Sequence, residues 1–147
     1  MIHVNSVTAA LFNQLSSDPV LTSSGFVIQE GEAFNTDIGH TPWVGLYYGN
    51  LSITPQTLGG THPWLGELDL FIYVQEGSHR SGQEATRLLS QAQNAVLDAM
   101  IADRSLGGTV LMLTGMEIAP FQRDLADDSW LFTNEVSLRA ELRGTSE

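Results

Sequence analysis

The feature that most constrains the fold is the segment from Leu65 to Glu76, in which side chains alternate with a period of two. One side of this segment is purely aliphatic, and the other mixes carboxylates, aromatics and an amide. The aliphatic side consists of Leu68, Leu70, Ile72 and Val74. A period of two predicts a β-strand with one face on a core. The fold must therefore bury the aliphatic side of this strand, and the mixed side is left for solvent or for contacts.

A long amphipathic helix follows the strand. Ser81, with Glu84 three residues later, has the form of a capping box, which predicts that the helix begins there. Apolar residues then recur at helical spacing over more than three turns: Leu88, Leu89, Ala92, Ala95, Val96, Ala99 and Met100. We expect Arg104 in the last turn and Gly107-Gly108 as the C-terminal stop.

The other predicted elements are shorter. A first helix of about ten residues is expected after a cap at Asn5 or Ser6, ending at the residues before Pro19. Strands are expected at Phe26–Ile28, Trp43–Tyr48, Thr109–Ala119 and Trp130–Arg143. Gly49-Asn50 reads as a turn that lets residues 51–53 pair back as a hairpin. A polar loop is expected over residues 120–128.

Two further segments, Glu30–Pro42 and Pro55–Pro63, are rich in Gly, Pro, Thr and Asn and poor in core residues. Long irregular connections inside a compact domain are usually functional or disordered. The element order predicts an α+β fold over residues 1–147 as a single domain. We expect a mainly antiparallel sheet with a loop-rich β insertion, and with the long helix and the short N-terminal helix packed on one face.

Composition excludes several function classes. The chain has 6 basic residues, all arginine, against 17 acidic ones, a formal net charge of -11. This balance argues against a dedicated nucleic-acid-binding module, which needs clustered basic residues. The absence of cysteine excludes disulfide scaffolds, thiolate metal sites and cysteine catalysis, and fits a reducing compartment. No apolar run is long enough to span a bilayer, and the N-terminus lacks the pattern of a signal peptide. We therefore expect a soluble cytoplasmic protein.

Three groups of residues have the chemistry of a site, and each also has a structural explanation. His62 lies near Glu67 and Asp69 and would complete a metal triad if its loop folded back, or it is a solvated loop histidine. Glu67 and Asp69 share a strand face, as acid/base carboxylates or as part of a solvated or interface surface. Ser81 lacks the nucleophile-elbow sequence and is explained as a helix cap.

A fourth group, the acidic residues Asp124, Asp127 and Asp128, lacks the glycine and glutamate spacing of an EF-hand. The glycine pairs lack phosphate-binding patterns. We therefore assign no catalytic residue, no metal and no cofactor, and we expect a protein that is not an enzyme.

The second face of the central strand is the strongest candidate for a contact surface. Phe71 and Tyr73 lie there beside Glu67, Asp69 and Gln75. Exposed aromatic residues with a polar rim are typical of interaction surfaces. The alternative is that further strands or the first helix cover Phe71 and Tyr73.

The second half of the chain resembles a known family. The strand LGELDLFIYVQEG leads into a helix ending AVLDAMIADRSLGGTVLMLTGMEI, followed by a final strand WLFTNEVSLRAELR. This order is similar to the tail terminator proteins (minor tail protein U-like, tail completion) of long-tailed bacteriophages, from about Val7 to Arg143. The family's helix typically runs into an L-x-D-x-x-L-G-G-x-V stretch, matched here by Leu97–Asp103 and then Ser105–Val110. The loops of the first half match no family pattern.

The resemblance implies a virion structural protein that forms a homohexameric ring on the tail tube, at the tail end nearest the head, after assembly in the host cytoplasm. Such a ring ends tube polymerisation and offers a surface to the head–neck connector protein. Its partners would be other copies of itself, the tail tube protein and the connector. DNA would pass through it without specific binding, and no membrane is involved.

On this basis we expect certain residues at contacts. The predicted interface residues are Trp64, Glu67, Asp69, Phe71, Tyr73 and Arg123, and the predicted channel-facing acidic residues are Glu30 and Glu32. Either Glu30–Pro42 or Gly49–Trp64 is expected to form an arm that reaches a neighbouring subunit.

Three alternatives remain open from the sequence. One is another tail or neck component, such as a tube subunit or a head-completion protein. Another is a small α+β enzyme that uses Glu67 and Asp69, or His62. The third is a monomeric ligand-binding domain.

Overall fold

The computed structural model describes residues 4–30, 43–55, 64–78, 82–126 and 129–144. Three helices are present: α1 (Val4–Ser16), α2 (Pro19–Ser23) and α3 (Gly82–Ala102). The strands are β1 (Val27–Glu30), β2 (Trp43–Pro55), β3 (Trp64–Ser78), β4 (Met112–Ala126) and β5 (Ser129–Gly144). They form a five-stranded sheet in the order β1-β2-β3-β5-β4.

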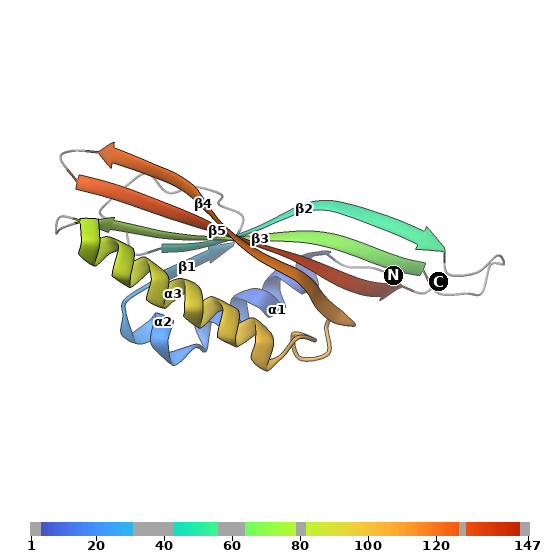
Figure 1. Ribbon diagram of the computed structural model, residues 1–147. Helices are drawn as coiled ribbons and strands as arrows, with labels where there is room; N and C mark the ends of the chain where they lie inside the picture. The colour runs from blue at the N-terminus through green and yellow to red at the C-terminus, as the bar shows by residue number, and fades with distance from the viewer. Residues whose placement is uncertain (1–3, 31–42, 56–63, 79–81, 127–128, 145–147) are drawn as a thin grey trace.

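The sheet is mainly antiparallel, with β1 and β2 as its parallel pair. All three helices lie on one side of it, and β2, β3 and β5 extend past the helices at one end (Figure 1). Helix α3 packs on β3 and β5, whereas α1 packs on β1 and β2. The predicted α+β class, with helices on one face of a mainly antiparallel sheet, is confirmed.

The core lies between this sheet face and the helices. Leu68, Leu70, Ile72 and Val74 of β3 are all fully buried in it, as their period of two predicts. Helix α3 contributes its apolar stripe, which includes Leu89, Val96 and Met100. Burying each such side chain stabilises the fold by about 1.5–3 kcal/mol. The two strongest patterns in the sequence therefore form the two halves of one core.

The predicted turn at Gly49-Asn50 is wrong, because β2 continues through it as one strand. The register between β2 and β3 shifts between Tyr48 and Leu51, which is a β-bulge. A bulge accommodates an extra residue without reversing the chain. The segment Gly49–Pro55 therefore lies in the sheet beside β3, and the loop part of the proposed arm is residues 56–63, which lie outside the described residues.

The predicted polar loop over residues 120–128 is also wrong up to Ala126, because β4 runs from Met112 to Ala126 paired with β5. Residues 120–126 form a strand because their backbone groups pair with those of β5. The pairing continues past Pro120, where the register shifts a second time at a bulge. The expected strand start at Thr109 is replaced by turns, so β4 begins at Met112.

Smaller differences concern the helix ends. Helix α2 was not predicted, although it begins with the sequence signal of an N-cap: the Asp18 carboxylate accepts hydrogen bonds from the amides of Val20 and Leu21. Helix α3 ends at Ala102, so Arg104 lies just beyond its last turn. Within the described residues, no helix is long and apolar enough to cross a membrane.

Candidate interaction surface

The candidate site is the sheet face opposite the helices, which we call the outer face. The strand register places alternate residues of β3 and β5 on it, including Glu67, Asp69, Phe71, Tyr73, Gln75, Thr133, Glu135, Ser137, Arg139 and Glu141. The predicted contact residues of β3 thus share one face, as the period of two requires. The helices lie on the other side of the sheet (Figure 1), so the first helix does not cover Phe71 or Tyr73.

An ion-pair cluster occupies one end of this face. The Arg139 guanidinium lies 3.5 Å from Glu67 Oε2 and 3.3 Å from Asp69 Oδ1. Arg139 is 54% exposed, and an exposed cluster of this kind stabilises the fold by at most about 1 kcal/mol. Glu67 and Asp69 therefore share one exposed cation, Arg139.

Tyr73 is directly opposite Glu135 in the sheet and hydrogen-bonds to its carboxylate. Burial, and the negative charge of Glu135, raise the pKa of the Tyr73 hydroxyl above its usual value. Ser137 also donates to Glu135 Oε1, at 2.9 Å. Tyr73 is only 8% exposed, so its ring packs within this network and is not available as a free contact.

Phe71 packs against the bulge of β2. A Cβ placed on Gly49 would lie 2.7 Å from Phe71 Cε2, so the ring occupies the space that a larger residue would need. Beside Phe71, a shallow groove of about 410 Å³ runs toward β4 and is lined by Asp69, Phe71, Thr114, Gly115, Glu117, Ser137, Leu138 and Arg139. The groove follows the β4 bulge between Thr114 and Glu117.

The other end of the outer face is closed. Three residues at that end have only 0–2% of their surface exposed: Trp43, Gln75 and Thr133. Trp43 Nε1 donates to Gln29 Oε1 at 2.7 Å, and Gln75 Nε2 donates to Thr133 Oγ1 at 3.2 Å. Only the half around Arg139 and Phe71 is therefore accessible for contact.

The glycine stretch named in the family resemblance forms a structural turn after α3. The Asp103 carboxylate accepts hydrogen bonds from Ser105 N, Ser105 Oγ and Gly107 N, and these bonds lower its pKa. Leu106 has a positive φ of 49° and is 3% exposed, so its buried side chain holds the strained backbone in place. Gly107 and Gly108 take positive φ without strain.

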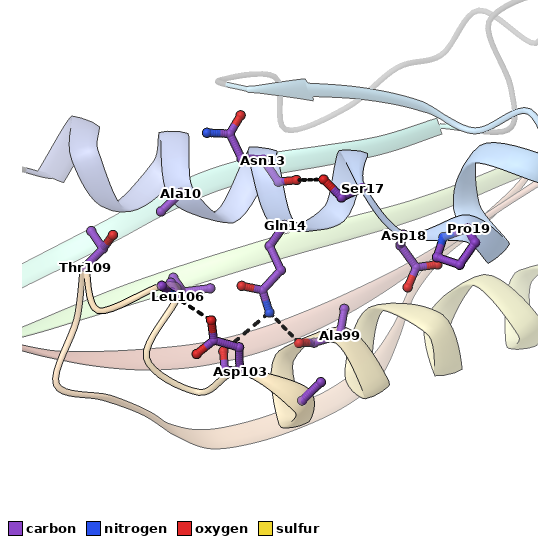
Figure 2. Close-up of a pocket in the computed structure, with 12 residues that line it drawn as sticks. Ala10, Asn13, Gln14, Ser17, Asp18, Pro19, Ala99, Asp103, Leu106 and Thr109 are labelled. Carbon is purple, nitrogen blue, oxygen red and sulfur yellow. Dashed lines mark hydrogen bonds between the residues drawn. The ribbon is translucent and has the colours of Figure 1, made fainter.

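A second hollow lies where this turn meets α1. Figure 2 shows Gln14 reaching from α1 to the end of α3, where its amide donates to the carbonyl oxygens of Ala99 and Asp103. The hollow has a volume of about 650 Å³. Three of its polar lining side chains have partners within the fold: Gln14, Asp18 and Asp103.

The remaining predicted site residues fall elsewhere. Trp64 is the first residue of β3, and Arg123 lies in β4 opposite Phe132. Glu30 is exposed at the end of β1. Asp124 is in β4. Five more lie outside the described residues: Glu32, His62, Ser81, Asp127 and Asp128. Among the described residues, no group of three or more His, Cys, Asp or Glu side chains could hold a metal ion.

Sequence reasoning missed Arg139, Glu135 and Gly49 as partners of the predicted residues. The sequence did indicate part of this, because charged and apolar residues alternate along the closing strand that contains Glu135 and Arg139. It could not be used before the register of β5 on β3 was known, since a shift of one residue would move every charge to the other face.

Comparison with known proteins identifies the fold. No protein-family model matches the chain, and no curated protein matches it. A solved chain from the virion of a native gene transfer agent (GTA) particle matches with a TM-score of 0.54 and 16% sequence identity. The match covers 94% of this chain and 95% of that chain. The two chains therefore share a fold over almost their whole lengths.

Proposed function

We propose that this chain is a structural subunit of a phage-like virion, and that it acts as a tail terminator. The observation that carries the proposal is the fold shared end to end with a chain of a gene transfer agent virion. The sequence resemblance to tail terminators supports the more specific role, since it concerns the same strand–helix–turn–strand order that forms β3, α3, β4 and β5.

The chemistry of the outer face supports contact and not catalysis. Its two candidate acid/base residues, Glu67 and Asp69, are engaged by Arg139. The groove beside Phe71 is shallow and open, and the hydroxyl of Tyr73 is held by Glu135. A non-enzymatic subunit needs such a surface only for packing against neighbours.

The charge of the molecule fits passage of DNA. On the outer face, the carboxylates of Glu67, Asp69, Glu135 and Glu141, together with Glu117 of β4, outnumber the two arginines that the register places there, Arg139 and Arg143. Six copies at -11 each would carry a formal charge of -66. An acidic channel repels phosphates, so DNA slides through without being held. In this proposal the partners are other copies of the chain, the tail tube protein and the head–neck connector protein, and the ring sits at the head end of the tail.

The test is the mass and shape of the purified protein, alone and with tail tubes. We expect a closed ring of six copies by light scattering and negative-stain microscopy, and binding of that ring to one end of purified tubes. Tubes assembled in its presence should stop growing at the bound end. Filaments that lengthen with protein concentration would indicate a tube subunit instead. A protein that stays monomeric and does not bind tube ends would contradict the proposal.

A further inference from the structure

A hollow of about 510 Å³ lies where β1 ends beside β2. Its described lining consists of Thr8 of α1, Glu30 of β1, and Leu46, Tyr47 and Tyr48 of β2. In the parallel pairing of β1 with β2, Glu30 is level with Leu46, whose side chain lies in the core under the helices. The Glu30 side chain is therefore on the helix side of the sheet, and the hollow lies between α1 and the edge of β2.

The hollow contains a carboxylate that the described part of the chain leaves unpaired. Glu30 is exposed, and no described residue forms an ion pair or a hydrogen bond with its carboxylate. The neighbouring polar side chain, Thr8, is already used, because its hydroxyl donates to the Asn5 carbonyl at 3.1 Å. The negative charge in this hollow is therefore available to a cation from outside.

Two tyrosine rings line the same hollow at the sheet edge. Tyr47 and Tyr48 are 42% and 53% exposed. Their ring centroids are 6.4 Å apart and their planes differ by 22°, so the rings are nearly parallel. The face of an aromatic ring attracts a cation, and a planar guanidinium stacks on it as well. A carboxylate and two tyrosine rings in one hollow thus have the chemistry that recognises an arginine side chain.

The edge of β2 at this hollow also has backbone groups to offer. Strand β1 pairs with β2 from Trp43 to Leu46, and no described strand pairs with the outer edge of β2 from Tyr47 to Thr54. Residues 47–54 read YYGNLSIT, without a charge or a proline. Free edges of monomeric proteins usually carry such residues to prevent pairing. An edge without them is a template for an extended segment of another chain.

The opposite edge of the sheet is blocked where β4 begins. Leu113 N donates to Arg104 O at 2.8 Å, and the Arg104 guanidinium donates to Leu113 O from two nitrogens, at 3.0 and 3.3 Å. Farther along, β4 contains Pro120 and charged residues, which protect an edge. Strand β1 is only four residues long. The long open edge among the described strands is therefore that of β2.

Charge favours a different protein, and not a second copy, as the source of the arginine. The chain has no lysine, and each arginine side chain that the structure describes already has a partner: Arg87, Arg104 and Arg139. A second copy would also bring a net charge of -11 toward Glu30, which opposes its approach. A protein with a basic segment would be attracted instead.

We infer that the hollow at the end of β1 is a docking site for an arginine side chain on an extended segment of another protein, which pairs along the outer edge of β2 from Tyr47 to Thr54. Glu30 binds the guanidinium, the rings of Tyr47 and Tyr48 stack on it, and the β2 backbone holds the segment. The inference goes beyond the proposed function, because it specifies the chemistry of a partner and does not depend on ring formation.

A pair of synthetic peptides tests the site. One short peptide alternates threonine and valine around a central arginine, and its twin has citrulline there, which keeps the shape of arginine without the charge. Each is titrated into the isotope-labelled full chain and followed by NMR. We expect the arginine peptide to bind at least tenfold more tightly, and to shift and slow the exchange of backbone amides within residues 47–54. Equal affinity for the two peptides, or no added protection of these amides, would overturn the inference.

Variants of the hollow separate this site from the general acidity of the chain. Glu30→Gln and Tyr48→Leu should each weaken binding of the arginine peptide at least fivefold, and Glu30→Gln should leave the citrulline peptide unaffected. The matched control, Glu117→Gln, removes one exposed carboxylate from β4 and should leave the affinity unchanged. Circular dichroism of each variant should match the parent. A loss from Glu117→Gln as large as that from Glu30→Gln would overturn the inference.

The outcomes for the two proposals are distinguishable. A chain that forms the ring and binds neither peptide overturns the inference and leaves the proposed function standing. A chain that binds the arginine peptide as expected, but stays monomeric and does not bind tube ends, contradicts the proposed function and leaves the inference standing.

Discussion

At the residue scale, Asp103 stabilises the turn that follows α3. Its carboxylate holds the amides of Ser105 and Gly107, and those bonds lower its pKa below the usual value. A lowered pKa in the folded state stabilises the fold above the usual pKa of aspartate, about 3.9, and this contribution is lost as pH falls through the lowered value.

We expect Asp103→Asn to lower the thermal midpoint at pH 7, and the difference from the parent to shrink steadily in acid. Thermal unfolding followed by circular dichroism from pH 7 to about pH 2 would measure both effects. Asp98→Asn is the control, because Asp98 is exposed on α3 and lies outside the turn whose amides bind Asp103. An equal difference between Asp103→Asn and the parent at every pH would contradict the role of the charge.

At the scale of elements, Gln14 joins α1 to the C-terminal end of α3. Its amide donates to the carbonyls of Ala99 and Asp103 (Figure 2), which also accept backbone hydrogen bonds from Asp103 N and Leu106 N respectively. Gln14→Met keeps the length of the side chain but leaves those carbonyls without this donor. We expect the free energy of unfolding to fall by about 1 kcal/mol, measured by urea denaturation. Asn13→Ala, one residue away on the exposed side of α1, should change it by less than about 0.5 kcal/mol.

The elements that sequence predicted correctly are those whose pattern is strong over many residues. The alternation in β3 and β5, and the apolar stripe of α3, each predicted both the kind of secondary structure and the side that faces the core. Prediction failed where a neighbour decided the outcome. Gly49-Asn50 has turn chemistry, but pairing with β3 makes it a bulge, and Pro120 reads as a loop residue although β5 holds it in β4.

At the scale of the whole molecule, the acidity of the chain opposes assembly. Copies at -11 each repel one another. Raising the ionic strength from about 0.01 to 0.15 M shortens the Debye length from about 30 to about 8 Å and screens this repulsion.

We therefore expect the association of copies to strengthen several-fold over that range, as measured by sedimentation velocity at fixed protein concentration. The Ile101→Lys variant, which changes one exposed position on α3, should behave in the same way. Weaker association at higher salt would indicate that ion pairs between subunits hold the ring, and would contradict the expectation that net repulsion opposes assembly.

The sequence by itself determined the α+β class, the buried side of the central strand and helix, and the residues that share the outer face. It did so because hydrophobic periodicity is a local property that burial must satisfy. Only the tertiary structure decided the partners of those residues: Arg139 beside Glu67 and Asp69, Glu135 beside Tyr73, and Phe71 over Gly49. The order and register of strands are set by long-range backbone pairing, and those pairings bring together residues far apart in the chain. The same fold places Arg104, from the turn after α3, against the backbone of Leu113 in β4, which no local pattern could have shown.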